Sequence, residues 1–140
     1  MTADSQCIFC KIASGDIPAE KVFEDDACVA FLDIGPLAEG HTLLIPKQHY
    51  ETMAVMPPDA AAALLKNLPA LVGAITAATG CEGVNVLQNN GRAASQVVPH
   101  VHVHIIPRRA GDAFRHNWPA GTYAKGRITQ VAGEIRRNLA

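Results

Sequence analysis

The sequence predicts an α+β fold in which a mainly antiparallel sheet carries helices, organised as a single domain over residues 1–140. Short β-prone segments occur in both halves of the chain, and a long stretch between them has apolar residues at helical spacing. Strands and helices do not alternate strictly, as they would around a parallel sheet. A chain of 140 residues that is 49% hydrophobic can build one substantial core.

The first half of the chain is predicted to hold a short helix followed by three strands. These elements are a helix over residues 7–14 and strands over residues 21–24, 28–33 and 42–45. Gly15 should end the helix, Asp25 and Asp26 should form the turn between the first two strands, and Pro46 should close the third strand.

A long helix is predicted to follow, because residues 57–59 (two prolines and an aspartate) suit a first helical turn and Gly80 suits an end. The apolar residues at helical spacing are Leu64, Leu68, Leu71 and Ile75. Pro69 should kink this helix, because it has no N–H for the carbonyl of Leu65.

The same stretch is the most apolar part of the chain. Lys66, Asn67 and Pro69 interrupt it, so we interpret residues 60–78 as a buried helix and not as a membrane span. Because it is apolar nearly all round, a domain of this size can hardly bury it alone. A homodimer is therefore expected.

The second half of the chain is predicted to hold two more strands and a C-terminal helix. The strands, residues 83–87 and 98–106, flank a polar loop over residues 88–96. The apolar stripe of the amphipathic C-terminal helix is formed by Ile128, Val131, Ala132, Ile135 and Leu139. Arg136 and Arg137 should lie on its solvent face.

Charge and targeting signals narrow the class of ligand and the compartment. The formal net charge is −1, without a basic stripe, which argues against nucleic-acid binding but permits a mononucleotide-sized ligand. The polar N-terminus lacks the features of a secretory signal, so a cytoplasmic location is expected. The four cysteines should then be reduced thiols or metal ligands.

Three histidines alternate with apolar residues in the last predicted strand. Side chains alternate between the faces of a strand, so His100, His102 and His104 should share one face. This pattern can arise in an ordinary strand, can chelate a metal, or can support phosphoryl chemistry, because imidazole is a nucleophile and an acid–base group near neutral pH. The preceding polar loop offers small residues and backbone N–H groups to a phosphate.

The run over residues 100–106 matches the His-φ-His-φ-His-φ-φ signature and resembles the histidine triad family, in which φ is an apolar residue. Further segments that resemble this family are residues 8–12, 31–34 and 40–47 and Gln96. The resemblance extends from Cys7 to Arg108.

The resemblance implies a purine nucleotide hydrolase or nucleotidyl transferase that acts at the α-phosphate through a covalent nucleotidyl-histidine intermediate. His102, the middle histidine, would be the nucleophile. Its other nitrogen must then hold a proton, which a nearby backbone carbonyl could fix. His104 would bind phosphate oxygens or assist the leaving group, and His41 would lie near the same oxygens.

The resemblance also implies a nucleotide pocket. Asp33 would accept hydrogen bonds from the ribose hydroxyls, while Asn89 and Gln96 would contact ribose or phosphate. The slot for the base would be formed by Ile8, Phe9, Ile12, Phe31 and Ile34. Ile12 and Phe31 could equally be core residues, and Asn89 could be a turn residue.

The leaving group is less defined. Many members of the Hint branch have serine three residues before the first triad histidine, where this chain has Val97. The chain therefore resembles the bacterial Hit-like group more closely, with phosphoramidates, adenylated amines and dinucleoside polyphosphates as candidate substrates. Specificity in the family involves the C-terminal segment that here holds Phe114, His116 and Trp118.

A structural zinc site is also implied. Cys7 and Cys10 form a C-x-x-C pair, and some histidine triad proteins complete such a site with histidines that correspond to His49 and His100. The alternative is a pair of reduced, partly buried thiols.

Two other functions remain open at this stage. One is a metal-dependent hydrolase with zinc at the triad itself, and the other is a non-catalytic nucleotide sensor or scaffold. Histidine triad proteins are usually twofold dimers, which agrees with the dimer expected from the long helix.

Overall fold

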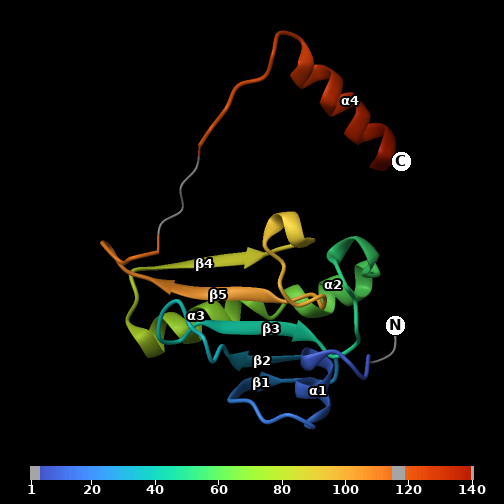
Figure 1. Cartoon of the computed structure of the whole chain (residues 1–140). Helices are drawn as coiled ribbons and strands as arrows, with labels where there is room; N and C mark the ends of the chain where they lie inside the picture. Colours follow the sequence, from blue (N-terminus) through green and yellow to red (C-terminus); the bar gives the residue numbers. More distant parts are fainter. Residues whose placement is uncertain (1–3, 115–118, 140) are drawn as a thin grey trace.

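A five-stranded antiparallel sheet forms the centre of the computed structural model, which describes residues 4–114 and 119–139 (Figure 1). The strand order is β1-β2-β3-β5-β4. The strands are β1 (Lys21–Glu24), β2 (Cys28–Leu32), β3 (Thr42–Pro46), β4 (Gly83–Gln88) and β5 (Val103–Arg108). The predicted α+β class and antiparallel sheet are confirmed.

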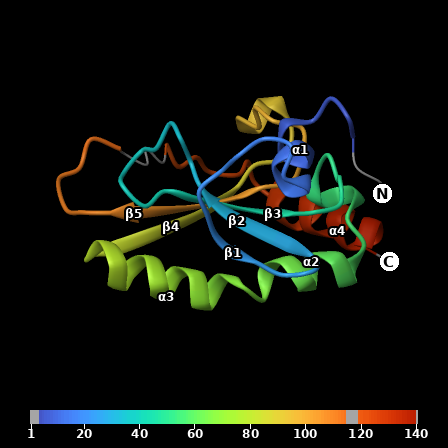
Figure 2. The ribbon, with the colours of Figure 1, turned by 90° about the horizontal axis from the view of Figure 1, so that it is seen from below.

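Helices lie on both faces of the sheet (Figure 2). The helices, with their 3₁₀ turns, are α1 (Ile8–Ser14), η1 (Met53–Val55), α2 (Pro58–Leu65), α3 (Leu68–Thr79), η2 (Arg92–Ala94) and α4 (Arg127–Leu139). The α2–α3 pair covers one face, and α1 lies on the other. Gly15 ends α1 in the left-handed conformation, as predicted.

The predicted long helix is two helices. Pro69 cannot donate to the carbonyl of Leu65, and the chain breaks just before it, between α2 and α3. Asn67 stabilises the break, because its Nδ2 donates to the carbonyls of Ala63 and Leu64 at 3.0 and 3.2 Å. These bonds supply additional donors to carbonyls at the end of α2, where the regular helical bonds stop.

The α2–α3 pair is buried on one side only. Leu64, Leu71 and Ile75 pack against the sheet in the main core cluster. Over Pro58–Thr79, which by length and composition alone could cross a membrane, only 17% of the most apolar 18-residue window is buried. The stretch is therefore buried only on the side that faces the sheet. Its outer face carries small and apolar side chains and is exposed, in line with the expectation that one domain cannot bury this stretch alone.

The last strand is shorter at its start than predicted. β5 begins at Val103 and not at residue 98, because the segment before it pairs with a loop. Here the N–H of Val101 donates to the carbonyl of Tyr50 at 2.8 Å. Only His104 of the three triad histidines therefore lies within the regular ladder.

The C-terminal helix is present as predicted but stands apart from the sheet, on the side of β4 (Figure 1). None of its residues is buried. Its apolar stripe therefore has no partner within the described part of the chain.

Candidate functional site

A cavity of about 730 Å³ opens on the face of the sheet opposite to α2 and α3. Its floor is one row of side chains that lie directly opposite one another across four strands. The row consists of Phe31, Leu43, His104 and Leu87. Strand alternation could have identified Leu43 and Leu87, because they share a face with His104.

The cavity collects nearly all the predicted nucleotide-binding residues. Those that line it are Ile8, Phe9, Ile12, Phe31, Asp33, Ile34, Asn89, His102 and His104, together with His41. Ile12 and Phe31 also belong to a buried apolar cluster, so they are core residues that line the cavity. Cavity residues that the sequence reasoning missed include Ile17, Leu37 and Ile106.

Gln96 does not line the cavity. Its side chain is buried, accepts the N–H of Gly91 at 2.7 Å and donates to the carbonyls of Glu51 and Val98 at 2.7 and 3.1 Å. These bonds fix the loop before the triad. The structure therefore gives Gln96 a supporting position and no direct place in the pocket.

His102 has the tautomer that a nucleophile needs. Its Nδ1 lies 2.7 Å from the carbonyl oxygen of His100, which can only accept, so Nδ1 carries the proton. The lone pair is left on Nε2, and His102 lines the cavity. The ring of Phe9 holds the imidazole by an edge contact, with the ring centroids 5.1 Å apart.

A second pair of histidines lies beside His102. The Nε2 of His41 is 2.9 Å from the Nδ1 of His104, and a carboxylate oxygen of Asp33 lies 3.7 Å from the same Nε2. Burial, together with smaller effects of the neighbouring His102 and His41, lowers the pKa of His104 to about 4. Burial also lowers the pKa of His41, against the opposing effect of Asp33. Both rings are therefore neutral at pH 7.

The loop over residues 33–41 places Asp33 and His41 together. The N–H of Asp33 donates to the carbonyl of His41 at 2.9 Å, which closes the loop, and an oxygen of Asp33 accepts the N–H of Gly35 at 2.8 Å. Gly40 has φ 94°, and a Cβ there would lie 2.7 Å from Thr79. Glycine is therefore required at this position.

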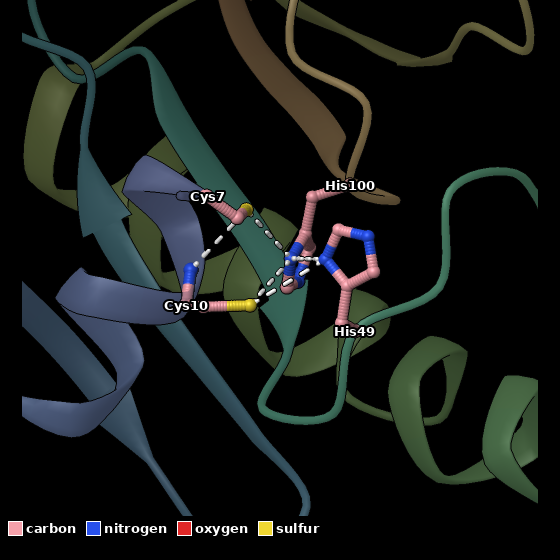
Figure 3. A group of neighbouring side chains, drawn as sticks. All are labelled: Cys7, Cys10, His49 and His100. Atoms are coloured by element: carbon pink, nitrogen blue, oxygen red, sulfur yellow. Dashed lines mark hydrogen bonds between the residues drawn. The ribbon is translucent and has the colours of Figure 1, made fainter. Parts of the chain in front are cut away.

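The cluster of Cys7, Cys10, His49 and His100 lies beside the cavity (Figure 3). Its ligand atoms lie within 4.8 Å of one another. The Nδ1 of His100 is 3.4 and 3.5 Å from the sulfurs of Cys7 and Cys10 and 3.3 Å from the Nδ1 of His49. The cluster could hold a metal ion.

The protonation of His100 suits metal binding. Its Nε2 lies 2.8 Å from the carbonyl of Pro46, so that nitrogen carries the proton and Nδ1 presents a lone pair to the cluster. Backbone N–H groups of Asp4 and Cys10 donate to the sulfurs of Cys10 and Cys7 at 3.3 and 3.5 Å. Such bonds are the outer-shell support that metal ligands usually have.

The loop before the triad and Phe114 also line the cavity. Val97, which stands where many members of the Hint branch have serine, lines the cavity and is 88% exposed. An apolar side chain therefore replaces a hydroxyl at this position. Phe114 lines the cavity beneath the guanidinium of Arg108, which lies 4.6 Å from the ring centroid. His116 and Trp118 lie outside the described residues.

Comparisons with known proteins agree with this geometry. The HIT domain matches residues 14–111. The chain is 48% identical to adenylylsulfatase HINT3 of Arabidopsis thaliana over 99% of its own length and 72% of the relative's. It is 44% identical to adenosine 5′-monophosphoramidase hnt1 of Schizosaccharomyces pombe, over 95% and 98% of the two chains.

Solved structures give the same result. A HIT family protein of Bacillus subtilis superposes with a TM-score of 0.92 at 40% identity, over 97% of this chain and 99% of that one. A zinc-bound histidine triad protein of Mycobacterium smegmatis superposes with a TM-score of 0.74 at 34% identity, over 96% and 97%. The chain belongs to the histidine triad family and is a nucleotide hydrolase of the HIT type.

Proposed function

We propose that the protein cleaves a purine nucleotide at its α-phosphate through a covalent nucleotidyl-His102 intermediate, with hydrolysis or nucleotidyl transfer as the outcome. The observation that carries the proposal is the tautomer of His102, whose Nε2 lone pair is available at the cavity. A bond forms between Nε2 and phosphorus as the bond to the leaving group breaks. Water or another acceptor then displaces His102, and two easier steps replace one difficult step.

The cavity supports an AMP-type ligand in one orientation. The apolar residues around Phe9 and Phe31, whose ring centroids are 5.7 Å apart, suit a purine base. Asp33 lines the same cavity with a carboxylate oxygen 3.7 Å from His41, and it would accept hydrogen bonds from the ribose hydroxyls while His102 and His104 contact the phosphate. Asn89 lines the same cavity and is placed to contact ribose or phosphate.

The leaving group defines the remaining part of the proposal. The activities of two relatives, adenylylsulfatase and adenosine 5′-monophosphoramidase, share an adenylyl group and differ in the group that leaves. Candidate substrates are adenosine phosphoramidate, adenylated lysine, adenylyl sulfate and, as the alternative, diadenosine polyphosphates. Parallel turnover assays of these compounds test the proposal. Tight AMP binding without turnover of any of them would instead favour a nucleotide sensor.

Asp33→Asn should weaken ribose recognition. We expect kcat/KM for an adenosine substrate to fall about 10- to 100-fold, because a charged acceptor of hydrogen bonds becomes a neutral one. The 2′,3′-dideoxy substrate should lose much less, because it has no hydroxyls to bind. Asp26→Asn, on an exposed turn, is the matched control. Equal losses on both substrates would contradict the assignment to ribose.

We also propose that the Cys7, Cys10, His49 and His100 cluster binds a structural zinc ion. Two sulfur and two nitrogen donors are a ligand set that zinc prefers, and all four protein positions are supplied, which is typical of a closed structural site. Zinc would tie the N-terminal helix to the segment before β5. A catalytic zinc at the triad is disfavoured, because the Nδ1 of His100 faces the cysteines and not His102.

A homodimer is the third part of the proposal. β4 is an edge strand, the outer face of α2 and α3 is exposed, and the apolar stripe of α4 is unburied. Basic side chains outnumber acidic ones in residues 119–139, whereas acidic side chains outnumber basic ones in residues 4–114. The C-terminal segment of one copy is therefore complementary in charge to residues 4–114 of a second copy. A second copy is therefore the partner proposed for α4.

Ile135→Asp should shift the dimer to monomer in sedimentation at low concentration, because it places a charge on the apolar stripe. Gln130→Asp adds the same charge on the opposite side of α4 and should leave the dimer intact. A monomeric wild-type protein, or a dimer that is insensitive to Ile135→Asp, would count against the use of α4 as a contact.

A further inference from the structure

Both ring nitrogens of His41 are hydrogen-bonded within the protein. The backbone N–H of Leu37 donates to Nδ1 at 3.1 Å, and a backbone N–H can only donate. Nδ1 must therefore hold a lone pair, so the single proton of the neutral ring is on Nε2. His41 is 3% exposed, and no ring nitrogen remains for a ligand.

The proton of His41 determines where the proton of His104 lies. The Nε2–H of His41 points at the Nδ1 of His104 at 2.9 Å, so Nδ1 of His104 is the acceptor. The proton of His104 is then on Nε2, the nitrogen left for a ligand in the cavity. If Nδ1 of His104 were also protonated, its N–H would face the Nε2–H of His41, and two donors would oppose each other. Moving the His41 proton to Nδ1 would only set that N–H against the N–H of Leu37.

The loop geometry holds the Leu37 amide in place. His41 donates its own N–H to the carbonyl of Ala38 at 3.0 Å, and the bond from Asp33 N–H to the carbonyl of His41 closes the loop. The titratable groups that face His104 are His41, His102 and Asp33. Asp33 lies 3.7 Å from the Nε2 of His41, too far for a hydrogen bond, so it does not replace His104 as the partner.

We infer that His41 is a positioning residue that fixes the tautomer of His104, so that His104 presents a neutral Nε2–H donor to the phosphate. Only the identity of the acceptor, a nucleotide phosphate, rests on the proposed function. A preorganised N–H stabilises the negative charge that grows on a phosphate oxygen as the Nε2 of His102 bonds to phosphorus. His41 and His104 keep their protons throughout, and the proton that an amine leaving group needs comes from solvent.

The tautomers can be measured without turnover. Long-range ¹H–¹⁵N correlation spectra of the full-length, zinc-loaded protein at pH 7 distinguish the two neutral forms of each histidine. We expect His104 and His41 in the Nε2–H form and His102 in the Nδ1–H form. In His41→Leu, the His104 signals should change to a mixture of tautomers or to the imidazolium form. His41→Gln keeps an N–H donor near the position of Nε2 and should preserve the Nε2–H form.

Kinetics provide a second readout. His41→Leu should lower kcat about 10- to 100-fold with little change in KM, and His41→Gln should recover most of this loss. A wild-type His104 in the Nδ1–H or imidazolium form would overturn the inference, and so would an unchanged His104 tautomer in His41→Leu. Failure of the proposed function would appear differently, as absent turnover with the expected tautomers.

Discussion

Replacing His102 with glycine is expected to reduce kcat/KM for an adenylated substrate on the order of 10⁴-fold, while AMP binding is retained. The side chain supplies the atom that bonds to phosphorus, so no neighbouring group can substitute for it. His104 cannot replace His102 as the nucleophile, because its Nε2 carries the proton and its Nδ1 lone pair accepts from His41. The cavity should otherwise keep its shape, since Phe9 also packs against Phe31 and His100 and the sheet holds the cross-strand row.

Added imidazole provides the matching control. A small imidazole can enter the space that His102→Gly leaves and should restore part of the activity by forming nucleotidyl-imidazole. His102→Asn fills more of this space and should respond less to imidazole. Activity of His102→Gly within tenfold of wild type, on every substrate that the wild-type protein turns over, would contradict the role of His102.

The second large effect is expected at the metal cluster. The double variant Cys7→Ser, Cys10→Ser should lose zinc and at least about 3 kcal/mol of unfolding free energy, because structural zinc sites contribute directly to folding. Activity should fall as well, since the carbonyl of His100 fixes the proton of His102. Metal analysis and denaturant titration measure the first two effects.

Cys81→Ser is the matched control, because Cys81 is also a free thiol but lies outside the cluster. It should keep one zinc ion per chain and near-wild-type stability. If the double variant kept its metal, or if wild-type protein prepared with zinc contained none, the structural zinc site would be wrong.

The tautomer of His102 was expected from the role that the resemblance implied, whereas the carbonyl that fixes it and the tautomer of His104 could not be obtained from sequence. Alternation along a strand placed three equivalent histidines on one face, but Val101 pairs with Tyr50, and the regular ladder begins only at Val103. His100 therefore lies in the metal cluster, while His102 and His104 line the cavity. The partners that fix the protons are backbone groups of His100 and Leu37, and backbone groups leave no trace in residue type.

Other features followed from local rules. Gly15 ends its helix as predicted, because the left-handed conformation is a local constraint. The missing N–H of Pro69 was also recognised, but its effect is a break between two helices and not the predicted kink in one. The exposed outer face of α2 and α3 agrees with the expectation that one domain cannot bury this stretch alone, but an apolar pattern does not say which molecule covers it. Gln96 shows the same limit, because a buried amide that organises a loop and an amide that contacts a ligand have the same sequence signal.

Trapping of the covalent nucleotidyl-His102 intermediate is the most direct test of the proposed mechanism. Wild-type protein and adenosine phosphoramidate or adenylyl sulfate would be mixed, quenched rapidly without acid, and examined by intact mass and peptide mapping. We expect one AMP unit per chain, attached to His102, and no such adduct in His102→Gly. An adduct on His104 or another residue, or a full turnover burst that leaves wild-type protein unmodified at every time point, would contradict it.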